Sequence, residues 1–298
     1  MIARFFNTAL IVCASLAVAS VTASTAAAGA PRIIGGVPAT PGAWPSAAFI
    51  QDTTANAIFS CSGTVIAPNV VLTAAHCVVD ENTQAIEPLN GFRVYTGSND
   101  WTTAPWSSGV YAVSVYPNFS ELSVGTTDYD IAVLELNNQT KAPPIPLATP
   151  GQTSLYTAGE NVVQVGWGVT STDPGAAEND SLMQANAVLQ ASGPCTSADQ
   201  VDSGNVFDSG DQLCTLPPPA TTQGSCSGDS GGPLVVDNAG TWTEIGLTTY
   251  GTCDPTQPDY YTNVSAFSRW LHNQIKEMPP RRSGGHTEAR PRKDGGSR

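Results

Sequence analysis

The amino-acid sequence predicts an all-β protein made of many short strands. Gly and Pro occur 28 and 23 times in 298 residues, and both residue types favour turns over long regular elements. Apolar and β-branched residues form short runs between these turns, whereas apolar spacing of the helical kind is scarce. Because 41% of the residues are hydrophobic, the chain can also bury a sizeable core.

Residues 1–28 have the pattern of a secretory signal peptide. Arg4 is the only charged residue, and an apolar run from Ala9 to Ala19 is followed by small residues. Cleavage fits after either Ala23 or Ala28. The apolar run is shorter than the ~20 residues that a membrane-spanning helix needs. We therefore expect a secreted, extracellular protein whose mature chain has no membrane span.

Six cysteines remain once Cys13 is removed with the signal peptide. An even number of cysteines in an exported chain predicts disulfides, and the sequence alone leaves their pairing open. No C-x-x-C or H-x-x-x-H pair occurs, so we expect no metal site, and we expect no cofactor. The six residues are Cys61, Cys77, Cys195, Cys214, Cys226 and Cys253.

Charge is distributed unevenly along the chain. Residues 33–278 contain four basic and 23 acidic residues, whereas residues 279–298 contain six basic and two acidic ones. An acidic body repels the phosphate backbone, which excludes nucleic acid as a partner. The basic segment 279–298 has almost no apolar residues, so it is expected to be a disordered tail.

The strand-like runs fall into two groups. The first lies within about 33–145 and the second within about 151–264, and the Pro-rich stretch Ala142–Gly151 connects them. Two lobes of strands are therefore predicted. The clearest runs are Asn69–Thr73, Ile131–Leu136, Asn161–Val165, Pro233–Val236, Thr241–Tyr250 and Asp259–Val264.

One helix is clear, over Ser265–Met278. Ser265 is the expected N-cap, and Pro279-Pro280 is expected to end the helix. The apolar residues that recur at steps of three and four are Phe267, Trp270, Leu271, Ile275 and Met278.

The segment from Gly228 to Pro233 reads Gly-Asp-Ser-Gly-Gly-Pro and indicates a nucleophilic serine. A serine hydroxyl attacks only when a base takes its proton and the backbone presents it outward. The flanking glycines allow a sharp turn at Ser230, and the N–H groups of Gly228 and Ser230 can then form an oxyanion hole. A Ser/Gly loop without chemistry is the alternative, but the six-residue motif is much more specific than G-x-S-x-G.

Three histidines compete for the role of general base. His272 lies on the predicted helix and His286 in the basic tail. His76 directly follows a strand, and a disulfide through the adjacent Cys77 would fix its backbone. His76 is therefore the expected base.

An acid is expected to orient the imidazole of that histidine. Asp130 stands at the start of a buried apolar run, where a carboxylate is costly unless it is hydrogen-bonded. A histidine ring would satisfy it. Asp128, two residues earlier, is the alternative, but it fits a turn position better.

Five segments, in this order along the chain, resemble the signature blocks of the chymotrypsin-like serine peptidases. The resemblance spans about 33–270 and is closest to the secreted, trypsin-like members. It implies two six-stranded antiparallel β-barrels, a site in the cleft between them, and a C-terminal helix. It also implies that His76 is general base and acid, that Asp130 orients it, and that Ser230 attacks. The segments are Arg32–Gly36, Thr73–Cys77, Asp130–Ala132, Gly166–Gly168 and Gly228–Pro233.

The same resemblance implies three disulfides and activation by cleavage. Residues 29–32 would form a short propeptide, and cleavage after Arg32 would free the α-amino group of Ile33 to insert beside Asp229. A buried Asp229 needs a cation, and the new terminus supplies one. The implied disulfides are Cys61–Cys77, Cys195–Cys214 and Cys226–Cys253.

The substrate pocket departs from the trypsin pattern. Trypsin-like members have an aspartate six residues before the nucleophile, where this chain has Gly224. The resemblance places Asp259 on the opposite wall of that pocket, lined also by Ser225, Tyr250 and Gly251. A pocket carboxylate favours Lys or Arg before the scissile bond. If Asp259 instead faces solvent, the pocket is neutral and accepts Leu, Phe or Tyr, and mixed cleavage is the intermediate case.

The sequence therefore predicts a monomeric serine endopeptidase made as a zymogen. Its expected partners are protein or peptide substrates and protein protease inhibitors. The competing hypothesis is a binding protein that keeps the fold without catalysis. Relatives of that kind lose triad residues, whereas this chain has all three.

Overall fold

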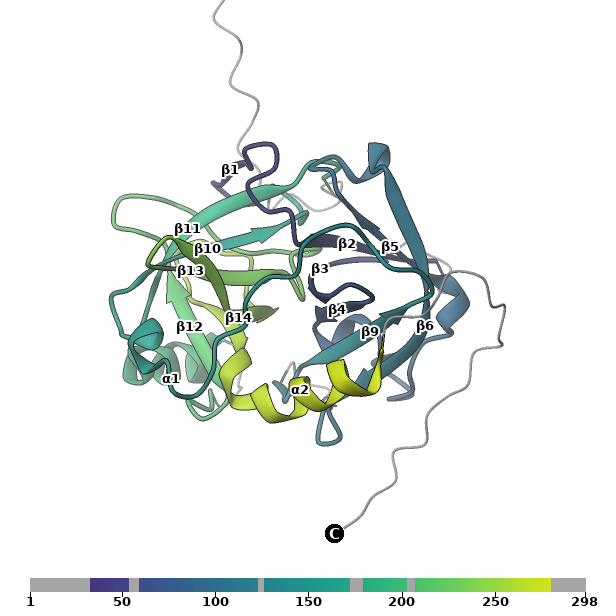
Figure 1. The fold of residues 1–298 in the computed structure, drawn as a ribbon. Coiled ribbons are helices and arrows are strands. Elements are labelled where there is room, and N and C mark those ends of the chain that lie inside the picture. The colour runs from purple at the N-terminus through teal and green to yellow at the C-terminus, as the bar shows by residue number, and fades with distance from the viewer. Residues whose placement is uncertain (1–32, 54–58, 123–125, 172–178, 203–206, 280–298) are drawn as a thin grey trace, which may run out of the picture. The chain divides into compact units, whose positions relative to one another are not determined.

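The computed structural model describes residues 33–53, 59–122, 126–171, 179–202 and 207–279 (Figure 1). The predicted signal peptide, the stub with Arg32 and the segment after Pro279 lie outside the described residues. Within the described ranges, no helix is both long and apolar enough to cross a membrane.

Six antiparallel strands of the first half close into a barrel, coloured from purple through blue to teal in Figure 1. The strands follow each other around the barrel in the order β2-β3-β4-β9-β6-β5, and β5 pairs back with β2. In β6, buried residues alternate with half-exposed ones, which is the period of two expected where one face of a strand meets a core. The strands are β2 (Ala47–Asp52), β3 (Phe59–Ala67), β4 (Val70–Thr73), β5 (Phe92–Thr96), β6 (Trp106–Val115) and β9 (Ala132–Leu136).

The second half repeats this arrangement. Its strands follow the order β11-β10-β13-β14-β15-β12, and β12 pairs back with β11 to close the ring. The short strand β1 (Val37–Pro38) extends the sheet beside β11, and β7 (Ser120–Leu122) and β8 (Thr126–Asp128) form a separate hairpin. The ring strands are β10 (Asn161–Gly166), β11 (Met183–Leu189), β12 (Gln212–Leu216), β13 (Pro233–Asn238), β14 (Thr241–Tyr250) and β15 (Asp259–Asn263). Two closed six-stranded barrels confirm the predicted fold class.

The C-terminal helix α2 (Ser268–Glu277) is shorter than predicted, because Val264–Phe267 forms a 3-10 turn first. The expected N-cap Ser265 is wrong. The Asn263 side chain caps the 3-10 turn instead, since its Oδ1 accepts from the Ser265 N–H at 3.1 Å and from the Ser265 hydroxyl at 2.9 Å, and α2 itself has no side-chain cap. The periodic apolar residues pack on the core of the first barrel, although the helix follows the second one.

A second helix, α1 (Ser192–Asp202), was not expected from the sequence. Its residues show no apolar periodicity, and its first turn contains Gly193 and Pro194. The disulfide from Cys195 to Cys214 at β12 fixes this segment instead. A covalent link therefore takes the place of the apolar stripe by which helices are recognised.

Three disulfides are present among the described residues. They join Cys61 to Cys77, Cys195 to Cys214, and Cys226 to Cys253, which are the pairs that the family resemblance implies.

Candidate active site

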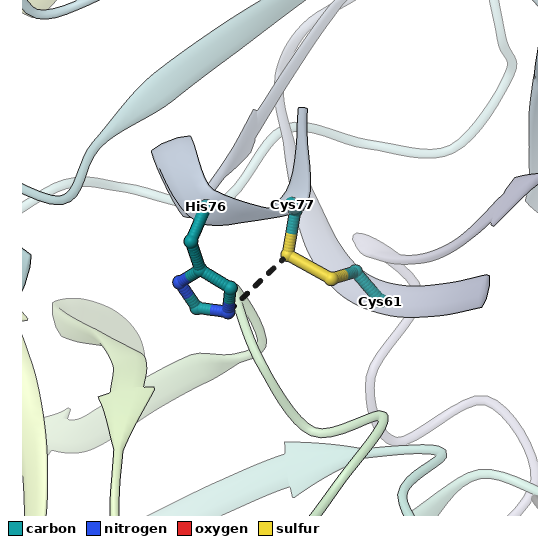
Figure 2. Close-up of side chains that lie close together, drawn as sticks. All are labelled: Cys61, His76 and Cys77. Atoms are coloured by element: carbon teal, nitrogen blue, oxygen red, sulfur yellow. Dashed lines mark hydrogen bonds between the residues drawn. A yellow bond between two sulfur atoms is a disulfide. The ribbon is translucent and has the colours of Figure 1, made fainter. Parts of the chain in front are cut away.

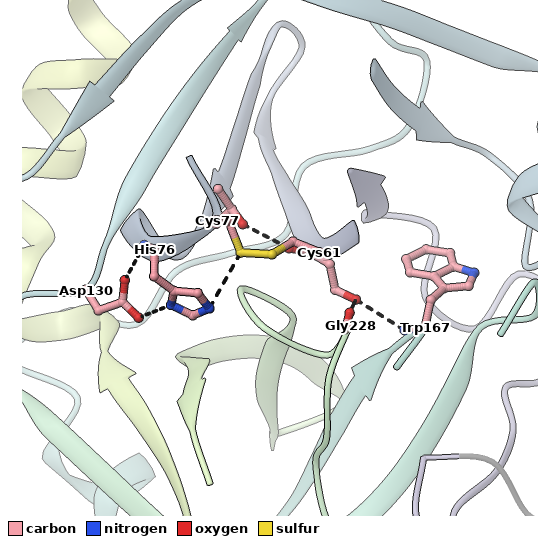
Figure 3. The surroundings of a disulfide bond; sticks show 8 residues. Cys61, His76, Cys77, Asp130, Trp167 and Gly228 are labelled. Atoms are coloured by element: carbon pink, nitrogen blue, oxygen red, sulfur yellow. Dashed lines mark hydrogen bonds and ion pairs between the residues drawn. A yellow bond between two sulfur atoms is a disulfide. The ribbon is translucent and has the colours of Figure 1, made fainter. Parts of the chain in front are cut away.

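His76 and Asp130 meet in the first barrel (Figure 3). His76 lies in a 3-10 turn, Ala75–Cys77, just after β4, and Asp130 lies just before β9. The His76 Nδ1 is 2.7 Å from Asp130 Oδ2, and the His76 backbone N–H donates to Asp130 Oδ1 at 2.9 Å. The Asp130 side chain is completely buried, whereas 14% of the His76 side chain is exposed. The alternative acid, Asp128, is exposed at the end of β8.

The Cys61–Cys77 disulfide lies against the His76 ring (Figure 2). Cys77 Sγ is 3.9 Å from His76 Nε2. These three residues have ligand atoms close enough to hold a metal ion, but the two sulfurs are bonded to each other and offer no thiolate. The contact is therefore packing that supports the backbone of the histidine turn.

The Ser230 loop packs directly on the segment that leads to His76. A Cβ added to Gly231 would lie 2.1 Å from Thr73 Oγ1 and 2.8 Å from the Ala74 nitrogen. Gly231 also has a φ of 73°, in the left-handed region that favours glycine. Only glycine allows the backbone beside Ser230 to approach this closely to the histidine segment.

The N–H groups of Gly228 and Ser230 donate no hydrogen bond to any other described residue. Gly228 has a φ of 92°, and its carbonyl accepts from the Ser62 hydroxyl at 2.9 Å. The Ser62 hydroxyl in turn accepts from the Trp167 N–H at 3.2 Å (Figure 3). With the Gly228 carbonyl held by Ser62, the two amide groups of the loop are left as donors for a ligand.

Asp229 is buried beneath this loop. Its carboxylate accepts from the Gly168 N–H at 2.8 Å and from the Cys226 N–H at 3.1 Å. A Cβ added to Gly166 or Gly168 would lie within 2.4 Å of the carboxylate, so both glycines are needed for its burial. Burial raises the pKa of Asp229 to about 7, the two N–H donors oppose the rise, and the negative charge of Asp259 adds to it.

Ile33 is fully buried against Met183 and Ala185. The next residue, Ile34, pairs with Gly224, whose N–H donates to the Ile34 carbonyl at 3.0 Å. The residues that directly follow Arg32 are therefore bonded to Gly224, which leads into the loop with Asp229 and Ser230.

Asp259 points inward, so the alternative in which it faces solvent is not what the structure shows. Asp259 is only 7% exposed, and its carboxylate accepts from the Ser225 N–H at 2.8 Å and from the Ser225 hydroxyl at 2.7 Å. A Cβ added to Gly251 would lie 2.7 Å from this carboxylate, and one added to Gly224 would lie 3.4 Å from it. Burial raises the pKa of Asp259 to about 6, and the two Ser225 bonds oppose the rise.

The family model for trypsin matches residues 33–271. The chain belongs to the trypsin family of serine proteases. It is 33% identical to a trypsin of Saccharopolyspora erythraea, over 72% of this chain and 86% of that protein. It is 30% identical to trypsin-1 of Astacus astacus, over 80% of this chain and 98% of that protein.

A human relative is longer than this trypsin-family chain. Transmembrane protease serine 5 of Homo sapiens is 28% identical over 83% of the chain, but the match spans only 52% of that protein.

Sequence reasoning about this trypsin-family site missed three hydroxyl groups. That of Ser62 donates to the Gly228 carbonyl, and those of Thr249 and Thr262 bond to each other, Thr262 also donating to the Asp130 carbonyl. Each is a single residue of a common type, and none belongs to a signature block. Of the other two histidines, His272 is exposed on α2, and His286 lies outside the described residues.

Gly231→Ala should strongly destabilise the protein and abolish activity, because the added Cβ would overlap Thr73 and Ala74. We expect a loss of roughly 3 kcal/mol or more in unfolding free energy, from the left-handed φ and the overlap together. The matched control is Gly240→Ala, where φ is 87° and no atom lies within 4 Å of the added Cβ. That variant should lose only about 1–2 kcal/mol and keep its activity. Equal losses in urea unfolding of the two variants would contradict the packing contact.

Proposed function

We propose that this chain is a secreted serine endopeptidase that hydrolyses peptide bonds in proteins with Ser230, His76 and Asp130. The observation that carries the proposal is the packing of the Gly231 backbone on Thr73-Ala74, which brings the nucleophile loop to the bonded His76–Asp130 pair. Family membership implies protein substrates, and the signal-like residues 1–28 support export.

In this proposal the Ser230 hydroxyl attacks the carbonyl carbon of the scissile bond while His76 Nε2 takes its proton. The N–H groups of Gly228 and Ser230 bind the oxyanion that forms. His76 then gives the proton to the leaving amine, and an acyl-enzyme remains on Ser230. Water, activated by His76, hydrolyses that ester. Asp130 holds the ring in the required tautomer through its bond to Nδ1 and stabilises the imidazolium.

We also propose that cleavage after Arg32 activates the protein. The structure gives Asp229 two N–H donors but no cationic side chain among the described residues. A new α-amino group at Ile33 would provide the missing positive charge. Asp229 lies between Gly228 and Ser230, whose N–H groups would form the oxyanion hole, and its carboxylate also bonds to the Cys226 N–H. An ion pair at Asp229 would therefore fix the backbone that carries the oxyanion hole.

For specificity, we propose that Asp259 is the anion that binds Lys or Arg before the scissile bond. Its carboxylate is held by Ser225 between Gly224 and Gly251, where an added Cβ would lie 3.4 and 2.7 Å from it, so no side chain from these two positions covers it. No described cationic side chain pairs with it, so a substrate side chain could supply the charge. Mixed basic and apolar cleavage is the alternative outcome for this pocket.

A labelled fluorophosphonate should modify Ser230 in the protein cleaved after Arg32. Ser230→Ala and His76→Ala should each abolish labelling and nearly all turnover. The double variant should be about as inactive as either single one, since triad residues act as a unit. Additive losses, measured as kcat/KM on a peptide substrate, would contradict the assigned pairing, and a wild-type protein without labelling would contradict the enzyme proposal.

Arg32→Gln should give a stable but inactive precursor. The raised pKa of Asp229 means that the uncut fold binds a proton more tightly than the unfolded chain does. Stability of the precursor should therefore fall as pH rises from about 4 to about 7, and cleavage should remove most of that loss by pairing Asp229. Thermal unfolding of cut and uncut protein across this pH range measures the difference. Full activity of Arg32→Gln would exclude this activation.

The preference for Arg over Phe should disappear in acid. Asp259 has a pKa of about 6, so its negative charge is present above that pH and is lost below it. His76 protonation affects both substrates equally. The ratio of kcat/KM for matched Arg and Phe substrates should therefore fall about tenfold per pH unit below about pH 6.

Asp259→Gly provides the control for this prediction. In that variant Arg cleavage should collapse at every pH, Phe cleavage should persist, and the ratio should no longer depend on pH. Unchanged Arg cleavage would show that Asp259 is not the pocket anion.

A further inference from the structure

Two buried threonines, Thr249 and Thr262, lie between the segments that carry the proposed catalytic residues. Thr249 is 5% exposed and Thr262 is 2% exposed, and their hydroxyl oxygens are 2.8 Å apart. A buried hydroxyl is costly unless it is hydrogen-bonded, so the partners of this pair fix its orientation.

One partner belongs to the first barrel. The Thr262 hydroxyl donates to the backbone carbonyl of Asp130 at 2.8 Å. Its single proton is thereby used, so the Thr249 hydroxyl is the donor within the pair. The other acceptor near Thr249, the Leu247 carbonyl, is farther away at 3.3 Å. The Thr249 hydroxyl also accepts from the Thr262 N–H at 3.0 Å, which closes the pair into a small ring.

At the other end of the pair, Thr249 directly follows a residue that bonds to the Ser230 loop. Thr249 lies at a register shift between β14 and β15, where Thr248 faces Tyr261 and Tyr250 faces Tyr260. Bulges of this kind redirect side chains, often beside active sites. The preceding residue, Thr248, accepts from the Gly231 N–H at 2.7 Å and donates to the Gly232 carbonyl at 2.9 Å. Thr248, which bonds to the Ser230 loop, is thus the neighbour of Thr249, which bonds to the Thr262 hydroxyl that holds Asp130.

The backbone around Asp130 needs such support. Tyr129, just before it, has a φ of 56°, which is strained for a residue other than glycine. The neighbouring Ile131 bonds only within the first barrel, to Tyr129 and Tyr116. In the part of the chain that the structure describes, the bond from Thr262 is the one hydrogen bond from the second barrel to Asp130.

We propose that the Thr249–Thr262 pair is a positioning device that aligns Asp130, and through it His76, with the Ser230 loop across the two barrels. The inference rests on the proposed triad. Neither hydroxyl bonds to His76 or Ser230, so the threonines act through Asp130 and the loop. Their loss should weaken the alignment of the reacting groups and leave substrate binding nearly unchanged.

The first test is Thr262→Val, which keeps the shape of the side chain and removes the hydroxyl, in protein cleaved after Arg32. We expect kcat to fall about tenfold, the equivalent of one hydrogen bond, and KM to stay within about twofold. Thr262→Ser keeps the donor and should restore most of kcat. If Thr262→Val does not fold, Thr249→Val, which removes the other hydroxyl, is expected to reduce kcat about threefold.

The chain offers a matched control. Thr96 and Thr140 form another buried hydroxyl pair, 2.7 Å apart, with no bond to Asp130, His76 or the Ser230 loop. Thr96→Val should lower the melting temperature about as much as Thr262→Val does, yet leave kcat unchanged.

A second readout separates positioning from stability and does not need turnover. We expect the proton on His76 Nδ1 to give a downfield-shifted ¹H NMR resonance, because it lies in the 2.7 Å bond to Asp130 Oδ2. In Thr262→Val this resonance should move upfield, since a less firmly held carboxylate bonds the Nδ1 proton less tightly. It can be measured in a Ser230→Ala background.

The outcomes distinguish this inference from the proposed function. Absence of fluorophosphonate labelling in the wild type would remove the enzyme proposal, while the resonance would still report on Thr262. The inference is overturned if folded Thr262→Val keeps the wild-type kcat and resonance, or if Thr96→Val loses as much kcat as it does.

Discussion

The geometry of the Ser230 loop depends on the burial of one carboxylate, that of Asp229. A buried carboxylate must find donors, and here they are the backbone N–H groups of Gly168 and Cys226. These bonds hold the Asp229 segment of the loop, and the N–H groups of Gly228 and Ser230 on either side of it bond to no described residue. Gly166 and Gly168 lack side chains for the same reason, because any Cβ there would collide with Asp229. The Gly-Trp-Gly block is thus a consequence of the same burial.

Contacts between the two barrels connect the Ser230 loop to the segments that carry His76 and Asp130. Gly231 packs on Thr73 in the first barrel, and Thr262 in the second barrel holds the Asp130 carbonyl. Each barrel alone would contain only part of the proposed site: the first has the proposed base and acid, and the second has the proposed nucleophile and pocket. Closure of both rings makes these contacts reproducible, because a closed barrel has no free edge along which a strand could slip.

The sequence predicted the elements whose signals are local, and it missed those that depend on distant partners. The limits of β14 were predicted to the residue, since Thr241–Tyr250 is a long run bounded by turn residues. Helix α1 was missed because a disulfide fixes it. The cap of the C-terminal segment was placed on Ser265 because a serine before an apolar run is the usual signal, yet Asn263, at the end of β15, reaches the same N–H group. Thr249 and Thr262 have no recognisable sequence signal. The position of Thr249 depends on a bulge, and the role proposed for Thr262 depends on a hydrogen bond to Asp130, 132 positions away.

Burial alone does not identify a functional carboxylate in this protein, and Glu244 shows why. Glu244 is completely buried, burial raises its pKa well above the ordinary value, and neither of its carboxylate oxygens has a hydrogen-bond partner among the described residues. Asp259 is nearly as buried, but two bonds from Ser225 stabilise its ionised form and hold its pKa at about 6. At pH 7 it is therefore an anion without a cationic partner among the described side chains. The difference lies in the donors: a buried acid remains charged, and can recognise a cation, only where the fold supplies hydrogen bonds to its carboxylate.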